Sequence, residues 1–283
     1  MTAASAAVAE DLRLLGRPLE RLEDAALLMG RGRYGDDMPV PPGTLHAAIL
    51  RSPYPHATIR AIDATAALAL PGVHTVVTGE DARRWTRPFT VGVKQPMEHW
   101  CLAVERVRYV GEPVAVILAE DRYRAEDALD AVTVSYEPLP TVVDPQQAAK
   151  SDAPLLHPAV GSNIVSERRF RYGDPETAFR AATRRIAVNI AYPRNAGTPI
   201  EGLIALAEYR PADSGYEVMA NFQGPFAMHP VMALALKVPG TRLRLKTPPD
   251  SGGSFGTKQS VFPYIVLMCV AARKAGRPVK WVE

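Results

Sequence analysis

The strongest candidate for ligand chemistry is a glycine-rich loop at residues 248–258, which reads Pro-Pro-Asp-Ser-Gly-Gly-Ser-Phe-Gly-Thr-Lys. Three glycines within five residues let the backbone approach a ligand closely and adopt dihedral angles that other residues avoid. Alternation at 242–246 predicts a strand before the loop, and the apolar run 261–273 predicts a buried helix after it. The unpaired N–H groups at the start of such a helix favour an anion or an oxo group in the turn.

Two common phosphate-binding motifs do not fit the spacing of this loop. A Walker loop has Gly immediately before its Lys, whereas Thr257 precedes Lys258 here. A dinucleotide fingerprint needs G-x-G-x-x-G, and only Gly253 and Gly256 stand at a matching interval. Because glycine-rich turns are also ordinary chain reversals, a tight turn without a ligand stays open as the alternative.

Strands and helices alternate around the loop, which predicts a chain of the α/β class. In the first half the pattern predicts strands at 45–50, 59–63, 73–78, 114–119 and 132–136, with helices at 65–70 and 122–131. In the second half it predicts strands at 164–172, 185–192, 200–209, 216–221 and 279–283, with helices that begin at Asp174 and cover 228–236. We therefore expect a leader at 1–28, a domain at 29–137, a linker at 138–162 and a second domain at 163–283.

Composition indicates a globular protein and argues against several classes of function. Hydrophobic residues make up 47% of the 283 residues, enough for a buried core. A formal net charge of +3 is too small to argue for nucleic-acid binding. Cys101 and Cys269 form no C-x-x-C motif, so we expect no iron–sulfur cluster or zinc knuckle in the chain itself. There is no apolar run of ~18 residues and no signal-peptide pattern, so we expect no membrane span and a cytoplasmic protein.

The loop resembles the G-G-x-F-G-x-K loop of the molybdenum-binding subunit in the xanthine dehydrogenase, aldehyde oxidase and carbon monoxide dehydrogenase family. Three further runs are similar to that family and occur in its order. They are Gly-Arg-Gly-Arg-Tyr-Gly-Asp-Asp at 30–37, Arg-Ser-Pro-Tyr-Pro-His-Ala at 51–57 and Tyr-Val-Gly-Glu-Pro-Val-Ala at 109–115. Four ordered matches across nearly the whole chain are far more specific than one glycine loop.

This resemblance implies an a/b hammerhead-like domain followed by the first part of a molybdopterin-binding domain. It implies that the chain is part of a molybdenum hydroxylase, an oxidoreductase that oxidises an aldehyde, an N-heterocycle or carbon monoxide with water as the oxygen source. The implied cofactor is molybdenum–molybdopterin, in the cytosine dinucleotide form if the protein is bacterial, with no direct metal ligand from this chain. The implied partners are the remaining C-terminal part of the molybdenum subunit, a small iron–sulfur subunit with 2Fe-2S clusters and a medium subunit with FAD.

Five residues match positions that the family places against its cofactor. Gln223 matches a Gln whose amide hydrogen-bonds an oxo ligand of molybdenum, and the alternative is a helix-start residue that faces water. Gly252 and Gly253 match positions of close approach to the cofactor. Phe255 matches an aromatic wall of the pocket, with a core residue as the alternative, and the Gly256 N–H matches an oxygen-binding donor.

Three further residues have both a functional and a structural interpretation. Gln259 stands where the purine-hydroxylating branch has a glutamate that contacts substrate, so this neutral residue puts purine substrates in doubt. Glu201 either orients a substrate or is a solvated or salt-bridged structural carboxylate. Lys258 either neutralises negative charge or extends to solvent.

The family's catalytic base is a glutamate far toward its C-terminus, so we expect no catalytic residue in this chain and the base beyond Glu283. The predicted strand at 279–283 stops without a cap, which favours a truncated gene product or one half of a split subunit. Alone, the chain is expected to be inactive. The rival hypothesis is a non-catalytic assembly module that docks onto the iron–sulfur and flavin subunits.

Overall fold

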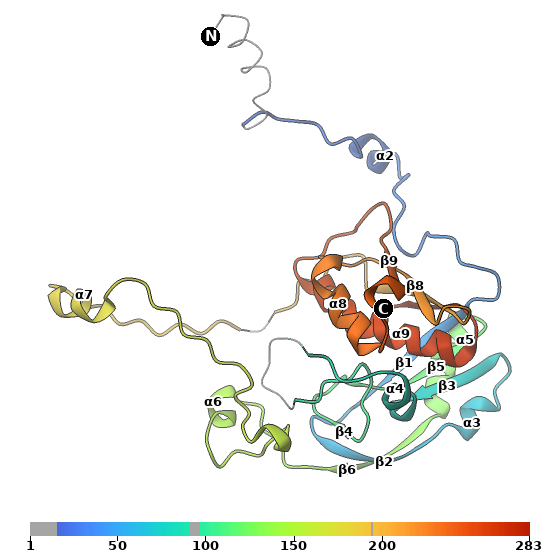
Figure 1. Cartoon of the computed structure of the whole chain (residues 1–283), viewed down its shortest axis with the longest axis horizontal. Coiled ribbons are helices and arrows are strands. Elements are labelled where there is room, and N and C mark those ends of the chain that lie inside the picture. The colour runs from blue at the N-terminus through green and yellow to red at the C-terminus, as the bar shows by residue number, and fades with distance from the viewer. Residues whose placement is uncertain (1–15, 91–96, 194) are drawn as a thin grey trace, which may run out of the picture.

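The computed structural model describes residues 16–90, 97–193 and 195–283, so the first fifteen residues of the expected leader lie outside it. The first part contains α2 (Asp24–Leu28), β1 (Leu45–Arg51), β2 (Ala57–Asp63), α3 (Thr65–Leu68), β3 (Val73–Thr78), α4 (Gly79–Trp85), β4 (Arg106–Val107), β5 (Pro113–Ala119), α5 (Arg122–Asp127), η1 (Ala128–Ala131) and β6 (Thr133–Pro138). The second part contains α6 (Pro145–Ala148), η2 (Pro158–Val160), α7 (Pro175–Ala181), β7 (Ile204–Arg210), β8 (Gly215–Ala220), α8 (Pro225–Ala235), η3 (Gly240–Arg242), β9 (Leu243–Lys246), η4 (Thr257–Val261), α9 (Phe262–Ala275) and β10 (Val279–Val282). Figure 1 shows their arrangement.

A seven-stranded mixed sheet with the order β3-β5-β1-β10-β7-β8-β9 forms the centre of the molecule. The last strand, β10, lies inside this sheet: it runs parallel to β1, with Leu45 opposite Val279, and antiparallel to β7. Strands from both expected domains therefore share one sheet. A small three-stranded sheet with the order β4-β2-β6 stands beside it.

Helix α9, which follows the glycine loop and η4, covers one face of the central sheet. Its eight central residues are all fully buried: Ile265, Val266, Leu267, Met268, Cys269, Val270, Ala271 and Ala272. The helix begins with Pro263 in its first turn and ends at Gly276, whose φ of 64° suits a left-handed C-terminal cap. Helix α8 packs beside it. Phe89, from the irregular stretch between α4 and β4, packs edge-on against Phe262 with ring centroids 4.9 Å apart.

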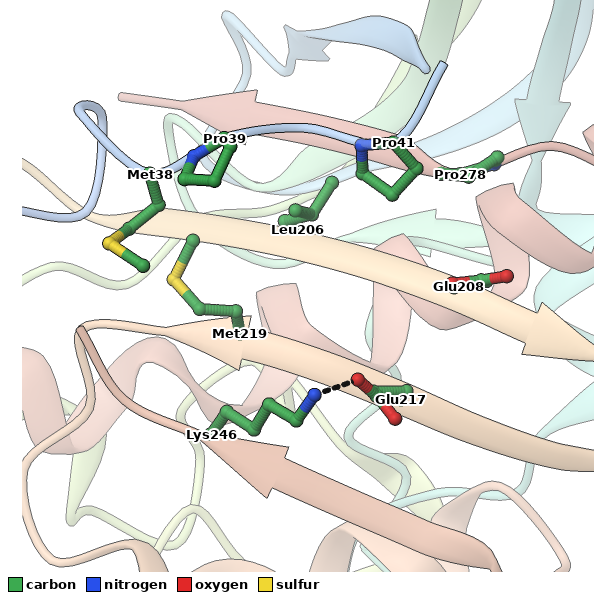
Figure 2. Close-up of a pocket in the computed structure, with 9 residues that line it drawn as sticks. All are labelled: Met38, Pro39, Pro41, Leu206, Glu208, Glu217, Met219, Lys246 and Pro278. Atoms are coloured by element: carbon green, nitrogen blue, oxygen red, sulfur yellow. Dashed lines mark hydrogen bonds and ion pairs between the residues drawn. The ribbon is translucent and has the colours of Figure 1, made fainter. Parts of the chain in front are cut away.

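The opposite face of the sheet carries the segment that follows α2. Figure 2 shows Met38, Pro39 and Pro41 lying across Leu206 and Met219, so this segment borders a shallow, partly apolar hollow. The hollow also contains an ion pair between Lys246 and Glu217. Because the segment is held on the sheet here, the preceding residues, Arg33 to Gly35, reach the glycine loop.

Two strand predictions are wrong. Residues 164–172 and 185–192 form no strand, and every described residue from 166 to 193 is exposed, with α7 as the only regular element between them. Alternation predicts one face that can be buried, but a strand also needs a neighbour, and the described residues pair none with either run. The predicted strand at 200–209 starts later, at Ile204, since Glu201 is used beneath the glycine loop. The mixed α/β class is confirmed.

Candidate functional site

The glycine loop turns sharply between β9 and η4 and uses left-handed backbone angles at three successive points. Gly253 has φ 93°, Phe255 has φ 51° and Gly256 has φ 90°. Glycine adopts these angles readily, but a phenylalanine there is strained, and such strain persists only where the surroundings hold it. The side chain of Phe255 folds back over Gly253, where an added Cβ would lie 3.1 Å from its ring. The loop is therefore a defined structure and not a slack connection.

Gln223 lies between β8 and α8 and is bonded to the loop through both its backbone and its side chain. Its N–H donates to the Lys258 carbonyl at 3.3 Å. Its side-chain Oε1 accepts from the Ser254 hydroxyl and from the Gly256 N–H, the latter at 3.2 Å. A backbone N–H can only donate, so the amide oxygen must face the loop. The Nε2 group of this exposed residue is consequently presented away from it.

The sequence predicts that the Gly256 N–H is free to bind an oxygen of a ligand. In the structure this N–H already donates to Gln223 Oε1 and does not face an open site. The donor that remains for an incoming oxygen is the amide N–H₂ of Gln223. Gly256 still leaves open space, since a Cβ added there would meet nothing within 4 Å, and the same holds at Gly224. The structure thus brings Gln223, Phe255 and Gly256 to one exposed surface of the loop.

Glu201 lies under the other side of the loop, where protein donors occupy both carboxylate oxygens. Oε1 accepts from the Gly35 N–H at 3.1 Å, and Oε2 accepts from the Gly252 N–H at 2.8 Å and from the Lys258 ammonium. Burial raises the pKa of this carboxyl, but the hydrogen bonds, with that from Lys258 the largest, outweigh it and hold the pKa below its usual value. This geometry matches the salt-bridged alternative for Glu201.

Lys258 does not extend to solvent, because its side chain is 1% exposed; its ammonium neutralises the carboxylate of Glu201. Gly252 is required by the same contact: a Cβ there would lie 2.4 Å from the Glu201 Cβ. The close approach at Gly252 is thus made by the protein's own carboxylate. Phe255 is 78% exposed, so it does not plug the core, and Gln259 is exposed near it.

Three residues of the site were missed by sequence reasoning. Ser254 fixes the amide of Gln223, and its only signal was the variable position of the loop motif. Asn221, 2% exposed, accepts from the Ile204 N–H at 2.9 Å and donates to the Gly202 carbonyl at 2.7 Å, which holds the segment after Glu201. Asp250 accepts from the Arg33 N–H at 2.6 Å. A polar residue that ends an alternating strand was the available signal for Asn221.

The site offers hydrogen-bond donors and an aromatic ring rather than metal ligands. Among the described residues, no group of three or more His, Cys, Asp or Glu side chains is placed to hold a metal ion. Nor does any helix in the described ranges have the length and apolar character needed to cross a membrane. The donors of the site can orient an oxygen-rich group.

Comparison with known proteins identifies the family to which the chain is similar. The family model for the a/b hammerhead domain of aldehyde oxidase and xanthine dehydrogenase matches residues 29–140, and the molybdopterin cofactor-binding domain matches 156–283. The chain is 36% identical over 278 residues to the carbon monoxide dehydrogenase large chain of Hydrogenophaga pseudoflava, covering 92% of this chain and 34% of that one. It is also 36% identical over 274 residues to the nicotine 6-hydroxylase large subunit of Paenarthrobacter nicotinovorans, with 95% and 33% covered.

Solved structures show the same relationship. Quinoline 2-oxidoreductase from Pseudomonas putida 86 superposes with a TM-score of 0.84 at 33% identity over 95% of this chain and 34% of its own. The Cu,Mo-CO dehydrogenase gives 0.80 at 33% identity, with 95% and 35% covered. The chain thus spans about a third of the length of these relatives. The two domain matches in sequence order, the glycine loop and the fold show that this chain belongs to the molybdenum-binding large subunits of the xanthine dehydrogenase, aldehyde oxidase and carbon monoxide dehydrogenase family.

Proposed function

We propose that this chain forms one wall of the cofactor pocket in a molybdenum hydroxylase, with molybdenum–molybdopterin against the exposed surface of the glycine loop. The observation that carries the proposal is the amide of Gln223, whose oxygen is held by Ser254 and Gly256 so that its N–H₂ is presented outward. A donor fixed in this way needs no reorganisation when it meets an acceptor oxygen.

The residues present fit such a group in two respects. The open space in front of Gly224 and Gly256 leaves room for a ligand close to the backbone. The donor, an amide N–H₂, suits oxo acceptors, and the carboxylate oxygens of Glu201 are turned to the interior. Gly253, which carries the ring of Phe255, completes this surface.

When bound, the cofactor supplies the oxidation of an electrophilic carbon with water as the oxygen source. Gln223 orients the cofactor through a hydrogen bond, and Phe255 offers an aromatic surface to the substrate. Gln259 is neutral, which disfavours purines and leaves aldehydes, N-heterocycles and carbon monoxide as substrates. Glu201 and Lys258 act indirectly: their buried pair holds the loop in the shape that Gln223 requires.

The remaining parts of the enzyme lie outside this chain. We place the general base beyond Glu283, in the remaining part of the molybdenum subunit, so the isolated chain is inactive. Electrons pass to a small iron–sulfur subunit with 2Fe-2S clusters and to a medium subunit with FAD. The enzyme is cytoplasmic, and its cofactor takes the cytosine dinucleotide form if the protein is bacterial. Support comes from the relatives, which are named as large chains or subunits of such dehydrogenases and hydroxylases.

A matched pair of glycine substitutions tests the proposal. Gly256 and Gly111 have nearly identical φ angles, 90° and 91°, and an added Cβ meets nothing within 4 Å at either position. Gly256→Ala and Gly111→Ala should therefore strain the backbone similarly, by about 1–2 kcal/mol. Only Gly256→Ala should block the cofactor.

The measurement is molybdenum per subunit, by elemental analysis, in the enzyme purified from its source cells through an N-terminal affinity tag. We expect wild-type content in Gly111→Ala and a loss of most of the metal in Gly256→Ala. Equal molybdenum in the two variants would show that the loop is an ordinary turn and that the cofactor binds elsewhere.

A further inference from the structure

Residues 166–193, which we call the arm, leave the body of the molecule between η2 and β7. Figure 1 shows this stretch, with α7 near its far end, extending away from the central sheet. Every residue of the arm is exposed. It enters no sheet among the described residues. Its backbone therefore has hydrogen-bonding groups available for a partner along most of its length.

The side chains of the arm are not those of a segment that stays in water. Seven large apolar or aromatic residues are at least 66% exposed: Phe170, Tyr172, Phe179, Ile186, Val188, Ile190 and Tyr192. Disordered linkers have few β-branched and aromatic residues, and exposed apolar surface of this kind marks an interaction site.

Residues 185–192 have the pattern of a strand with one buried face. Ile186, Val188, Ile190 and Tyr192 alternate with Arg185, Ala187, Asn189 and Ala191. In a strand the first set shares one face and the second set the other, whereas a helix would spread the bulky residues around its axis. An extended segment of this type binds by adding to the edge of a sheet, through backbone hydrogen bonds and alternate side chains.

The domain match indicates which surface receives the arm. The molybdopterin-binding domain matches 156–283, so the arm lies inside a domain and is not a spacer between domains. This chain spans about a third of the length of its relatives, so the portion of the large subunit outside that third can supply the missing neighbour. One free edge of the chain's own sheet, at β9, is a poor partner, because this strand carries Arg244 and Lys246 and would meet Arg184 and Arg185 of a second copy.

We infer that residues 185–192 form a β-strand on a sheet edge in the portion of the large subunit that this chain does not span, with Ile186, Val188 and Ile190 buried there. The identity of the occupant rests on the proposed function, which makes this chain one part of a larger subunit. The strand itself rests on the alternation and exposure of the arm. A side chain that is solvated in the isolated chain then becomes part of the core of the assembled subunit.

The test is hydrogen exchange of residues 185–192, by mass spectrometry, in the isolated chain and in the assembly purified from source cells through an N-terminal tag. We expect exchange to slow by roughly 100-fold or more in the assembly, as for a paired strand. Two neighbouring substitutions give the matched control: Ile190→Asp places a carboxylate on the apolar face, and Asn189→Asp places one on the other face. Neither should change the melting temperature of the isolated chain, where Ile190 is 86% exposed.

We expect Ile190→Asp to reduce the yield of assembled subunit by roughly tenfold or more, because a charge would be buried without a partner, while Asn189→Asp assembles as wild type. Unchanged exchange in the assembly, or equal assembly of the two variants, would overturn the inference. So would protection that appears in the isolated chain as its concentration rises, since the occupant would then be a second copy. An assembly that contains no molybdenum, but in which residues 185–192 are protected from hydrogen exchange, would count against the proposed function alone.

Discussion

Breaking the ion pair between Glu201 and Lys258 should destabilise the protein strongly, because Glu201→Gln leaves an ammonium group where water scarcely reaches. The side chain of Lys258 is 1% exposed and that of Glu201 is 10% exposed. Removal of one partner from a buried pair costs about 3–5 kcal/mol, since the other charge stays buried without compensation. We expect Glu201→Gln to lower the free energy of unfolding by that amount.

Substitution of the other partner, Lys258, should lower the free energy of unfolding by less. Lys258→Met leaves a carboxylate that still accepts from the N–H groups of Gly35 and Gly252, and methionine fills most of the vacated volume. We therefore expect a loss of about 1–3 kcal/mol, the typical effect of one lost polar partner. The double variant should be more stable than Glu201→Gln alone, because no unpaired charge remains inside the protein.

Urea titration of the four proteins at pH 7, followed by circular dichroism, measures these differences. The account requires the order wild type, Lys258→Met, Glu201→Gln from most to least stable. A loss below about 1 kcal/mol in Glu201→Gln would mean that the pair acts as a surface salt bridge and does not hold the loop. A greater loss in Lys258→Met would refute the asymmetry between the two partners.

Further predictions concern the pH dependence of Glu201 and Glu112 and the amide of Gln223. The pKa of Glu201 lies below its usual value, so the ionised carboxylate stabilises the folded protein at any pH above the unfolded-state pKa. This stabilisation is lost as the pH falls through the folded-state pKa. The free energies of unfolding of wild type and Glu201→Gln, measured by urea titration, should therefore converge from pH 7 to about 3. Burial raises the pKa of Glu112 from 4.5 to about 6, so the folded protein favours the protonated carboxyl. The resulting stabilisation of the fold is fully present below the unfolded-state pKa and is lost as the pH rises through about 6. Wild type should therefore lose about 2 kcal/mol relative to Glu112→Gln between pH 4 and 7, and a constant difference would contradict this. Finally, Gln223→Glu keeps an acceptor for the Gly256 N–H and Gln223→Ala does not, so hydrogen exchange at Gly256 should accelerate only in the second. Both variants lose the outward donor, and turnover of the assembled enzyme should fall by roughly 10²–10³, so wild-type turnover in Gln223→Glu would exclude the donor role.

Local patterns predicted most of the sheet. Continuous apolar runs such as 114–119 and alternation such as 216–221 correspond to β5 and β8, because those strands are buried by elements of the same chain. The run at 185–192 has an equally clear pattern and forms no strand. Periodicity reports which face of a segment can be buried and contains no information about whether a neighbour is available.

The glycine loop was recognisable from its residue types, but its hydrogen bonds were not. Glu201 lies 57 positions from Lys258 and 166 from Gly35, and only the fold brings these residues together. The direction of the Gln223 amide depends on Ser254, a position that the loop motif leaves variable. Spacing along the chain identifies a turn that can bind a ligand, whereas the three-dimensional structure determines which of its donors are already used.

The most direct test of the central claim is a cryo-electron microscopy structure of the molybdenum-loaded assembly, with this chain resolved at the glycine loop. The account predicts cofactor density against the exposed surface at Gly256, with Gln223 Nε2 at about 2.7–3.2 Å from a cofactor oxygen. Gln223 Oε1 should stay bonded to the Gly256 N–H, as it is at 3.2 Å here. Cofactor density on another face, or an amide turned so that its oxygen faces the cofactor, would contradict the account.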